Sequence, residues 1–235
     1  MYEYTERISY SKLAPDGNAS ICTILDLFQD CSIFDSEECG VSLKYMADHK
    51  LIWALSFWQI VIDRFPTLND VVTVGTVPYD FKGFMGYRSF WLKNNDITLA
   101  RANSIWSLIS AETGRPVKAS DEMISMYHTG EPVEMELAER KLRLTGEPEV
   151  LESFKIMPHN LDTNRHVNNG QFVRLAADYI PDGADISEIR AEYHMQAHIG
   201  DIFVPHVFKE KNSLGVSLRN PEGKSYCDVL FLSRS

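Results

Sequence analysis

The 235-residue sequence lacks the short motifs that mark metal, nucleotide and serine-hydrolase sites. It has no HExxH metal motif, no P-loop, no GxGxxG dinucleotide fingerprint and no GxSxG turn to hold a serine nucleophile. Neither a metal ion nor a cofactor is therefore expected. Any catalysis must come from ordinary side chains and main-chain amides.

Long apolar runs are also missing. The longest, over residues 51–62, is interrupted by Ser56 and Gln59 and falls short of the ~20 apolar residues that span a bilayer. The first 13 residues (MYEYTERISYSKL) contain no apolar signal core. The four cysteines form no CxxC pair, and we interpret them as reduced thiols. These features predict a cytoplasmic protein that does not act at a membrane.

Basic residues are scarce. Lys and Arg number 23 against 33 Asp and Glu, which gives a net charge of -10. Because affinity for phosphate backbones depends on clustered Lys and Arg, nucleic acid is not an expected partner. The one dense basic cluster consists of Arg140, Lys141 and Arg143.

Hydrophobic residues make up 44% of the chain, which is enough for a packed core, and their spacing gives one order of elements twice. Helical spacing occurs over residues 20–40 and 168–179. Strand-like patterns occur over 2–12, 51–63, 71–79, 85–93, 98–109, 151–157, 189–196, 202–209, 214–218 and 225–232. The repetition predicts an α+β fold with two copies of one unit, 1–130 and 151–235, joined by a charged and partly helical linker over 131–150.

The most informative segment contains Asp162, Asn164 and His166, spaced by two. In an extended chain this spacing puts all three side chains on one face. A helix start follows directly, where Asn168 can cap the helix and Gln171 can complete a capping box. The segment therefore predicts an acid, an amide and an imidazole beside the start of a helix.

The first amides of a helix lack partners within the helix and carry partial positive charge, so they can polarise a carbonyl and stabilise an oxyanion. A thioester suits such a site because its leaving thiol, with a pKa of roughly 8.5, needs little acid assistance. Asn, Asp and His before a helix also commonly form only turns and caps, and that structural role is the alternative.

The segment 161–169 (LDTNRHVNN) resembles the signature Leu-Asp-x-Asn-x-His-Val-Asn-Asn of acyl-acyl carrier protein thioesterases of the plant FatA/FatB and bacterial type. Segments 50–53 (KLIW), 102–106 (ANSIW) and 113–115 (TGR) resemble further motifs of that family. The resemblance spans nearly the whole chain. It implies two tandem hotdog domains, each an antiparallel sheet wrapped around a central helix, and hydrolysis of fatty acyl-acyl carrier protein to a free fatty acid.

The resemblance places the family's catalytic residues on Asp162, Asn164 and His166. A further catalytic Glu and the Cys after it fall on Gln196 and Ala197, which is a departure from the family pattern. Gln196 can hold a water molecule but cannot act as a base, and Ala197 excludes a cysteine nucleophile there. We therefore expect direct attack by water.

In this hypothesis the helix start at Asn168 binds the thioester oxygen, Asn164 orients the carbonyl or the water, and Gln196 positions the water. Either Asp162 or His166 takes the proton, and the sequence does not decide between them. The first helix contributes Leu25 and Phe28, which could line the site for the acyl chain or serve only in core packing. The basic cluster at 140–143 is the candidate docking surface for acyl carrier protein.

Three alternatives remain open. An acyl-CoA thioesterase on the same fold would differ only in the thiol carrier. A non-catalytic acyl-binding protein is compatible with Gln196. A hotdog dehydratase would need a catalytic His and an acid from different halves, and the first half has no comparable cluster. Either a monomer or a homodimer is feasible, because two domains in one chain supply the pairing that single hotdog domains obtain by dimerising.

Overall fold

The computed structural model describes residues 1–162 and 165–234. The chain divides into two compact units, Met1–Leu137 and Ala138–Ser235, and each is described by itself. The division falls inside the segment 131–150 that the sequence analysis interprets as a linker. None of the helices in the described residues is long and apolar enough to cross a membrane.

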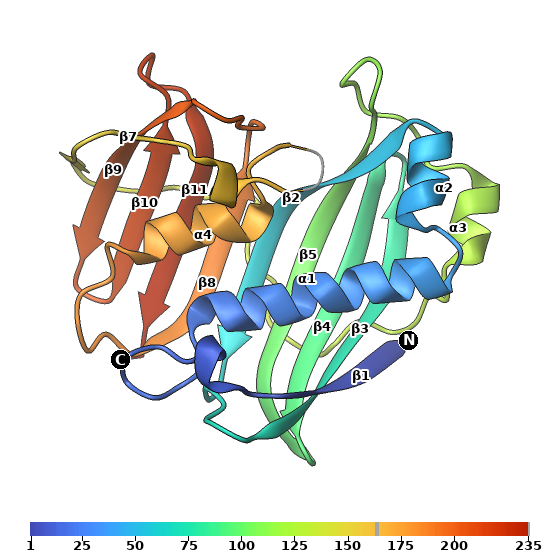
Figure 1. The fold of residues 1–235 in the computed structure, drawn as a ribbon, viewed down its shortest axis with the longest axis horizontal. Helices are drawn as coiled ribbons and strands as arrows, with labels where there is room; N and C mark the ends of the chain where they lie inside the picture. The colour runs from blue at the N-terminus through green and yellow to red at the C-terminus, as the bar shows by residue number, and fades with distance from the viewer. Residues whose placement is uncertain (163–164, 235) are drawn as a thin grey trace. The chain divides into compact units, whose positions relative to one another are not determined.

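The first unit is built on an antiparallel sheet (Figure 1). Its strands, in spatial order, are β1 (Tyr2–Arg7), β3 (Val71–Lys82), β4 (Met85–Asn94), β5 (Ile97–Ser110) and β2 (Leu51–Ile62). The two-residue loop between β4 and β5 begins at Asn95, whose φ of 52° suits a tight hairpin turn that asparagine tolerates.

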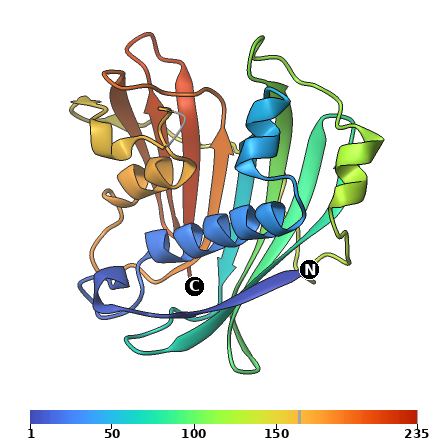
Figure 2. The same cartoon turned by 45° about the vertical axis from the view of Figure 1, so that its right-hand side comes forward.

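Helix α1 (Ile21–Glu38) crosses one face of this sheet and packs against β3 (Figures 1 and 2). The Ser20 hydroxyl caps it by accepting the Thr23 N–H at 3.1 Å, and Gly40, with a φ of 84°, follows its end. Phe28 is fully buried, where its ring lies 6.1 Å from that of Trp58 and 5.3 Å from that of Phe90. The buried helix predicted over residues 20–40 is confirmed.

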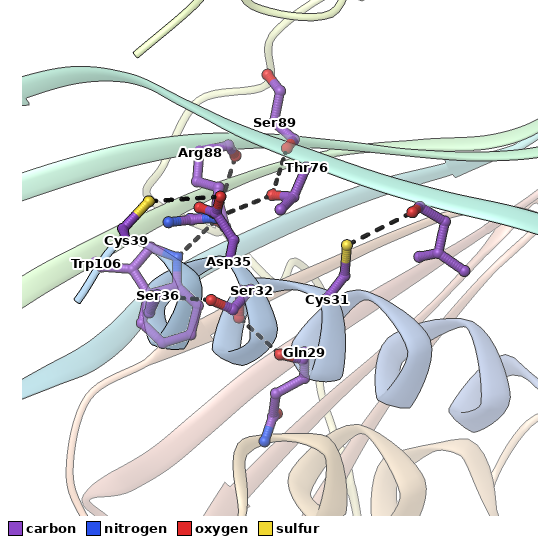
Figure 3. Close-up of polar contacts among 12 residues, drawn as sticks. Gln29, Cys31, Ser32, Asp35, Ser36, Cys39, Thr76, Arg88, Ser89 and Trp106 are labelled. Atoms are coloured by element: carbon purple, nitrogen blue, oxygen red, sulfur yellow. Dashed lines mark hydrogen bonds and ion pairs between the residues drawn. The ribbon is translucent and has the colours of Figure 1, made fainter. Parts of the chain in front are cut away.

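An ion pair lies buried between α1 and the sheet (Figure 3). Arg88 Nη1 donates to Asp35 Oδ2 at 2.6 Å, and the two side chains are 8% and 5% exposed. Arg88 also donates to Thr76 Oγ1 at 3.3 Å, and its guanidinium lies 5.8 Å from the centre of the Tyr127 ring. Short-range pattern analysis did not find this pair, because its members are 53 residues apart in the sequence.

Three short helices complete the first unit. They are the 3-10 helix η1 (Tyr10–Lys12), α2 (Leu43–Asp48) and α3 (Asp121–Met126). Residues of α2 and α3 share a small core with Val41, Leu108 and Tyr127 at one end of the sheet. The segments 39–50 and 117–127 are thereby anchored by apolar contacts of their own.

The second unit is also an antiparallel sheet with one main helix (Figure 1). Its strands, in spatial order, are β8 (Ile186–Tyr193), β11 (Ser225–Ser233), β10 (Ser213–Arg219), β9 (Ile202–Glu210) and β6 (Glu149–Val150), and β7 (Phe154–Lys155) also pairs with β9. The helix α4 (Asn169–Ala177) packs against β10 and β11, and the 3-10 helix η2 (Pro158–Asn160) precedes it.

The strand expected over residues 151–157 is reduced to the two residues of β7. Leu151 N–H donates to the Pro205 carbonyl at 3.0 Å, but proline has no N–H to return a bond on that side of β9. The ladder is therefore interrupted between β6 and β7, which explains why the predicted continuous strand is wrong.

The segment 131–148, all of which the structure describes, contains no helix, so the partly helical linker is also wrong. Its second part is held by β-sheet residues instead. Leu142 N–H donates to Glu192 Oε2 at 2.8 Å, and Leu144 packs so closely on Gly215 that a Cβ there would lie 2.7 Å from its side chain. These contacts favour an extended path over a helix.

Removal of one partner of the buried ion pair is expected to destabilise the protein strongly. Asp35→Ala leaves the Arg88 guanidinium buried without its counter-ion, so the free energy of unfolding should fall by about 3–5 kcal/mol. The double variant Asp35→Leu/Arg88→Met should lose less, because no charge stays buried. Urea titration followed by tryptophan fluorescence measures both.

The matched control is the exposed pair of Lys44 and Asp48, whose side chains are 82% and 59% exposed. Asp48→Ala should change the free energy of unfolding by about 0.5 kcal/mol or less. Equal losses for Asp35→Ala and Asp48→Ala would contradict the stabilising role of the buried pair.

Candidate active site

Asp162 and His166, the two ends of the Asp-Asn-His pattern, are hydrogen-bonded to each other, so the chain does not run extended from one to the other. Asp162 N–H donates to the His166 carbonyl at 2.8 Å, and Arg165 N–H donates to the Asp162 carbonyl at 3.1 Å. Arg165 has a φ of 64°, in the left-handed region. The expected extended conformation is therefore wrong, and Asn164 lies outside the described residues.

The Asp162 side chain explains the turn. Its Oδ1 accepts the His166 N–H at 3.1 Å, which is a bond that short acidic side chains form readily with the nearby backbone. Asp162 and His166 are both half-buried. Leu161 lies opposite Val167 in an antiparallel bridge. Asp162 and His166 therefore stay close together, although the chain does not follow the extended path expected between them.

The chain leaving this turn runs between two neighbours. Val167 N–H donates to the Ala197 carbonyl at 2.8 Å, and Asn168 N–H donates to the Asn160 carbonyl at 3.1 Å. The two bonds attach the residues between His166 and α4 to two other segments of the chain, one at Ala197 and one at Asn160. The backbone between His166 and the helix start is thus held by main-chain contacts.

Asn168 caps α4 as predicted, because its side-chain oxygen accepts the Gly170 N–H at 2.8 Å. The second bond of the predicted capping box is wrong. The Asn168 N–H is already bonded to Asn160, and Gln171 Oε1 instead accepts from the Asn160 side chain at 3.4 Å. Asn160, which is 6% exposed, is a supporting residue that the sequence analysis missed.

Tyr193 is a second missed residue. At the end of β8 its hydroxyl donates to the Asn169 carbonyl at 3.0 Å, and its ring packs against Phe172. Burial raises the pKa of Tyr193 well above its ordinary value, so it remains a neutral donor. The first turn of α4 is therefore bound directly to the sheet.

The segment after β8 brings a histidine to the candidate site. The Gln196 side chain is exposed, Ala197 is buried, and the His198 ring lies 4.9 Å from the His166 ring at an interplanar angle of 86°. No local sequence pattern indicates this contact, because the two histidines are far apart in the sequence.

His194 makes a separate ion pair. Its Nε2 lies 3.0 Å from Asp228 Oδ2, and Ser225 Oγ donates to Asp228 Oδ1 at 2.8 Å. The bond to Asp228 raises the pKa of His194 above its ordinary value, and the nearby Glu192 carboxylate acts in the same direction. Among the described residues, no group of three or more His, Cys, Asp or Glu side chains could hold a metal ion.

Leu25 and Phe28 belong to the first unit, whereas Asp162, His166 and Gln196 belong to the second. Both Leu25 and Phe28 are buried, in keeping with the packing role that was one of their two expected roles. Arg140, Lys141 and Arg143 are exposed on both sides of the buried Leu142, so their charges face solvent.

Comparison with known proteins establishes the family. Residues 1–127, more than half of the chain, match the family model of the acyl-ACP thioesterase N-terminal domain. The chain therefore belongs to the acyl-ACP thioesterase family, as the motif resemblance predicted.

Curated relatives agree with this family. A chloroplastic palmitoyl-acyl carrier protein thioesterase from Gossypium hirsutum is 28% identical, and the match covers 79% of this chain and 49% of the relative. An oleoyl-acyl carrier protein thioesterase from Arabidopsis thaliana is 26% identical over 81% of this chain and 59% of the relative. The chain thus spans about half the length of the curated relatives it matches.

Solved structures share the fold over nearly the full chain. An acyl-ACP thioesterase from Bacteroides thetaiotaomicron matches with a TM-score of 0.90 and 17% identity, covering 99% of this chain and 97% of that one. The 12:0-ACP thioesterase from Umbellularia californica matches with a TM-score of 0.86 and 19% identity, covering 99% and 96%. A large antiparallel sheet with few helices is common to the group.

The His194–Asp228 pair predicts a pH-dependent stability. Because folding raises the pKa of His194, its contribution is fully present below the unfolded value of about 6.5 and is lost as the pH rises through the folded value. In His194→Asn the free energy of unfolding should fall less steeply with increasing pH above about 6.5 than in the wild type. Urea titrations at a series of pH values measure this slope.

His49→Asn is the control. His49 is exposed in the first unit, and the hydrogen bond of its Nδ1 is to the Tyr45 carbonyl and not to a carboxylate. It should keep the wild-type slope. An unchanged slope in His194→Asn would show that the pair contributes no proton linkage.

Proposed function

We propose that this protein hydrolyses fatty acyl thioesters carried by acyl carrier protein, which yields a free fatty acid and the carrier thiol. Family membership supports the reaction class. The observation that carries the proposal is the turn that joins Asp162 to His166 immediately before the capped start of α4. A carboxylate, an imidazole and main-chain donors thereby occur within one short segment.

The proposed architecture is a tandem pair of hotdog domains. In each unit an antiparallel sheet packs against one main helix, α1 in the first and α4 in the second. The likeness to solved structures over nearly the full chain supports this fold.

The proposed oxyanion donor is the Asn169 N–H. The amides of Gly170 and Gln171 are bonded to the Asn168 side chain and carbonyl at 2.8 Å and 2.9 Å. Among the described residues of this first turn, the Asn169 N–H is the amide that forms no hydrogen bond to Asn168. Its N–H would bind the thioester oxygen and stabilise the negative charge that develops on attack.

The reaction then needs a water molecule and a proton acceptor. Gln196 and Asn164 are proposed to position the water and the carbonyl, and either Asp162 or His166 accepts the proton as the water oxygen bonds to the carbonyl carbon. The tetrahedral intermediate collapses with cleavage of the carbon–sulfur bond. The thiolate, with a pKa of roughly 8.5, leaves readily and recovers the proton from the acceptor.

Leu25 and Phe28 are proposed to contact the acyl chain from the first unit. Both side chains are buried and apolar, and each methylene group that they bury would contribute about 0.8 kcal/mol. An acyl-CoA thioesterase and a non-catalytic acyl-binding protein are the alternatives, and both differ from the proposal in measurable ways.

The catalytic proposal predicts that His166→Ala and Asn164→Ala each lower kcat for a fatty acyl-acyl carrier protein by about 100-fold or more. Each variant removes a group that acts on the water or the carbonyl. Release of free fatty acid is measured by mass spectrometry across acyl chain lengths, with the same acyl groups on CoA in a parallel series.

His49→Ala, in the first unit, is the control and should retain wild-type turnover. Near wild-type hydrolysis by both His166→Ala and Asn164→Ala would remove the site assignment. Equal or faster hydrolysis of acyl-CoA would favour the first alternative, and acyl binding without hydrolysis by the wild type would favour the second.

The docking proposal predicts a carrier-specific effect of charge reversal. Replacement of Arg140, Lys141 and Arg143 by Glu should raise KM for acyl-acyl carrier protein by about threefold or more, because each lost surface charge contact contributes roughly 0.2–1 kcal/mol. KM for acyl-CoA should stay unchanged, because the substitutions alter the proposed docking surface for acyl carrier protein and leave the candidate active site intact.

The matched control reverses three exposed basic residues of the first unit, Lys44, Arg115 and Lys118. It should leave both KM values near wild type. If reversal at 140–143 has no effect on the carrier-bound substrate, the docking surface lies elsewhere.

A further inference from the structure

His198 is the one titratable side chain described in ring contact with His166. The two ring centres are 4.9 Å apart and the planes are nearly perpendicular, at 86°. This is the edge-to-face arrangement that ring pairs favour over a face-to-face sandwich. A histidine ring has a broad second torsion angle, so its orientation depends on such neighbours.

The main chain holds this contact in register. His166 and His198 form an antiparallel bridge, and Val167 N–H donates to the Ala197 carbonyl at 2.8 Å beside it. Residues directly opposite each other in an antiparallel pair carry their side chains on the same face. The ring contact therefore follows from backbone pairing and is not an accident of two flexible side chains.

Asp201 anchors His198 from the other side. Asp201 Oδ2 accepts the His198 N–H at 2.9 Å, and Asp201 N–H donates back to the His198 carbonyl at 3.1 Å. The same Oδ2 lies 3.9 Å from His198 Nδ1. The turn 198–201 is thus closed by hydrogen bonds in both directions, which hold the backbone of His198.

We propose that His198 is a positioning residue that holds the His166 imidazole in its reactive orientation. The inference rests on the proposed function of His166. His198 is 57% exposed, and its contribution is the edge-to-face contact between its ring and that of His166. Loss of that ring lets the His166 side chain sample other orientations, and misalignment of a reacting group slows the chemical step.

The test compares His198→Ala with His198→Phe, because Phe keeps a flat ring at the same place without ring nitrogens. His198→Ala should lower kcat for acyl-acyl carrier protein by about 5-fold or more with KM within twofold of wild type, and His198→Phe should recover most of the loss. His49→Ala, which removes a histidine stacked on Tyr45 at 4.0 Å in the first unit, is the matched control and should have wild-type kcat.

A second measurement is independent of turnover. In proton–carbon NMR spectra the ring proton of His166 should carry a ring-current shift that disappears in His198→Ala and persists in His198→Phe. A kcat for His198→Ala within twofold of wild type, a Phe variant as slow as the Ala variant, or an unshifted His166 resonance would each overturn the positioning role. Full activity of His166→Ala would instead refute the proposed function, whatever the NMR spectra gave.

Discussion

The hydrogen bond from the His166 N–H to the Asp162 carboxylate is the contact on which the geometry of the candidate site depends. It closes a turn with Arg165 in the left-handed region, and that turn sets Leu161 opposite Val167. The chain then enters α4 after Asn168 with no freedom to change register. This bond of the His166 N–H therefore determines how the backbone of His166 approaches the first amides of the helix.

A hydrogen bond from a histidine main-chain N–H to a nearby aspartate occurs twice around the candidate site. The carboxylate of Asp162 accepts the main-chain N–H of His166, and the carboxylate of Asp201 accepts that of His198. Hydrogen bonds to ionised acceptors are short and comparatively strong, so each holds a backbone that would otherwise be free in a loop. The two rings then meet through backbone pairing. Asp201 Oδ2 also lies 3.9 Å from the Nδ1 of the His198 ring, so this carboxylate contacts both the main chain and the ring.

The sequence predicted elements well where a strong period extends over many residues. The buried helix after Ser20 and the long strands of the first half follow from apolar spacing alone, and the Asn168 cap follows from a short-range side-chain preference. The predictions that were wrong depend on contacts that no local pattern contains. Pro205 interrupts the pairing of 151–157 from the opposite strand, and Leu142 and Leu144 hold the linker in an extended form.

The candidate site was predictable in its composition but not in its shape. Spacing by two suggested an extended run at Asp162 and His166, yet an aspartate can satisfy nearby backbone groups itself, and here it forms a turn. Asn160, Tyr193 and His198 support the site from other segments, and only the fold brings them to it. The residue types of a short segment indicate which chemical groups a site can contain. The orientation of those groups depends on partners that are distant in sequence.

The interior of the first unit adds a constraint on any acyl chain that lies along α1. Leu25, Phe28, Ser32 and Asp35 occupy one buried face of the helix at helical spacing, so this face changes from apolar to polar along its length. Beyond Phe28 a methylene chain would meet the Asp35–Arg88 pair, and separation of these charges would leave both buried and uncompensated. On this face the apolar contact that α1 can offer is therefore confined to its first half, and the ion pair that stabilises the unit also limits the surface on which a fatty chain gains free energy.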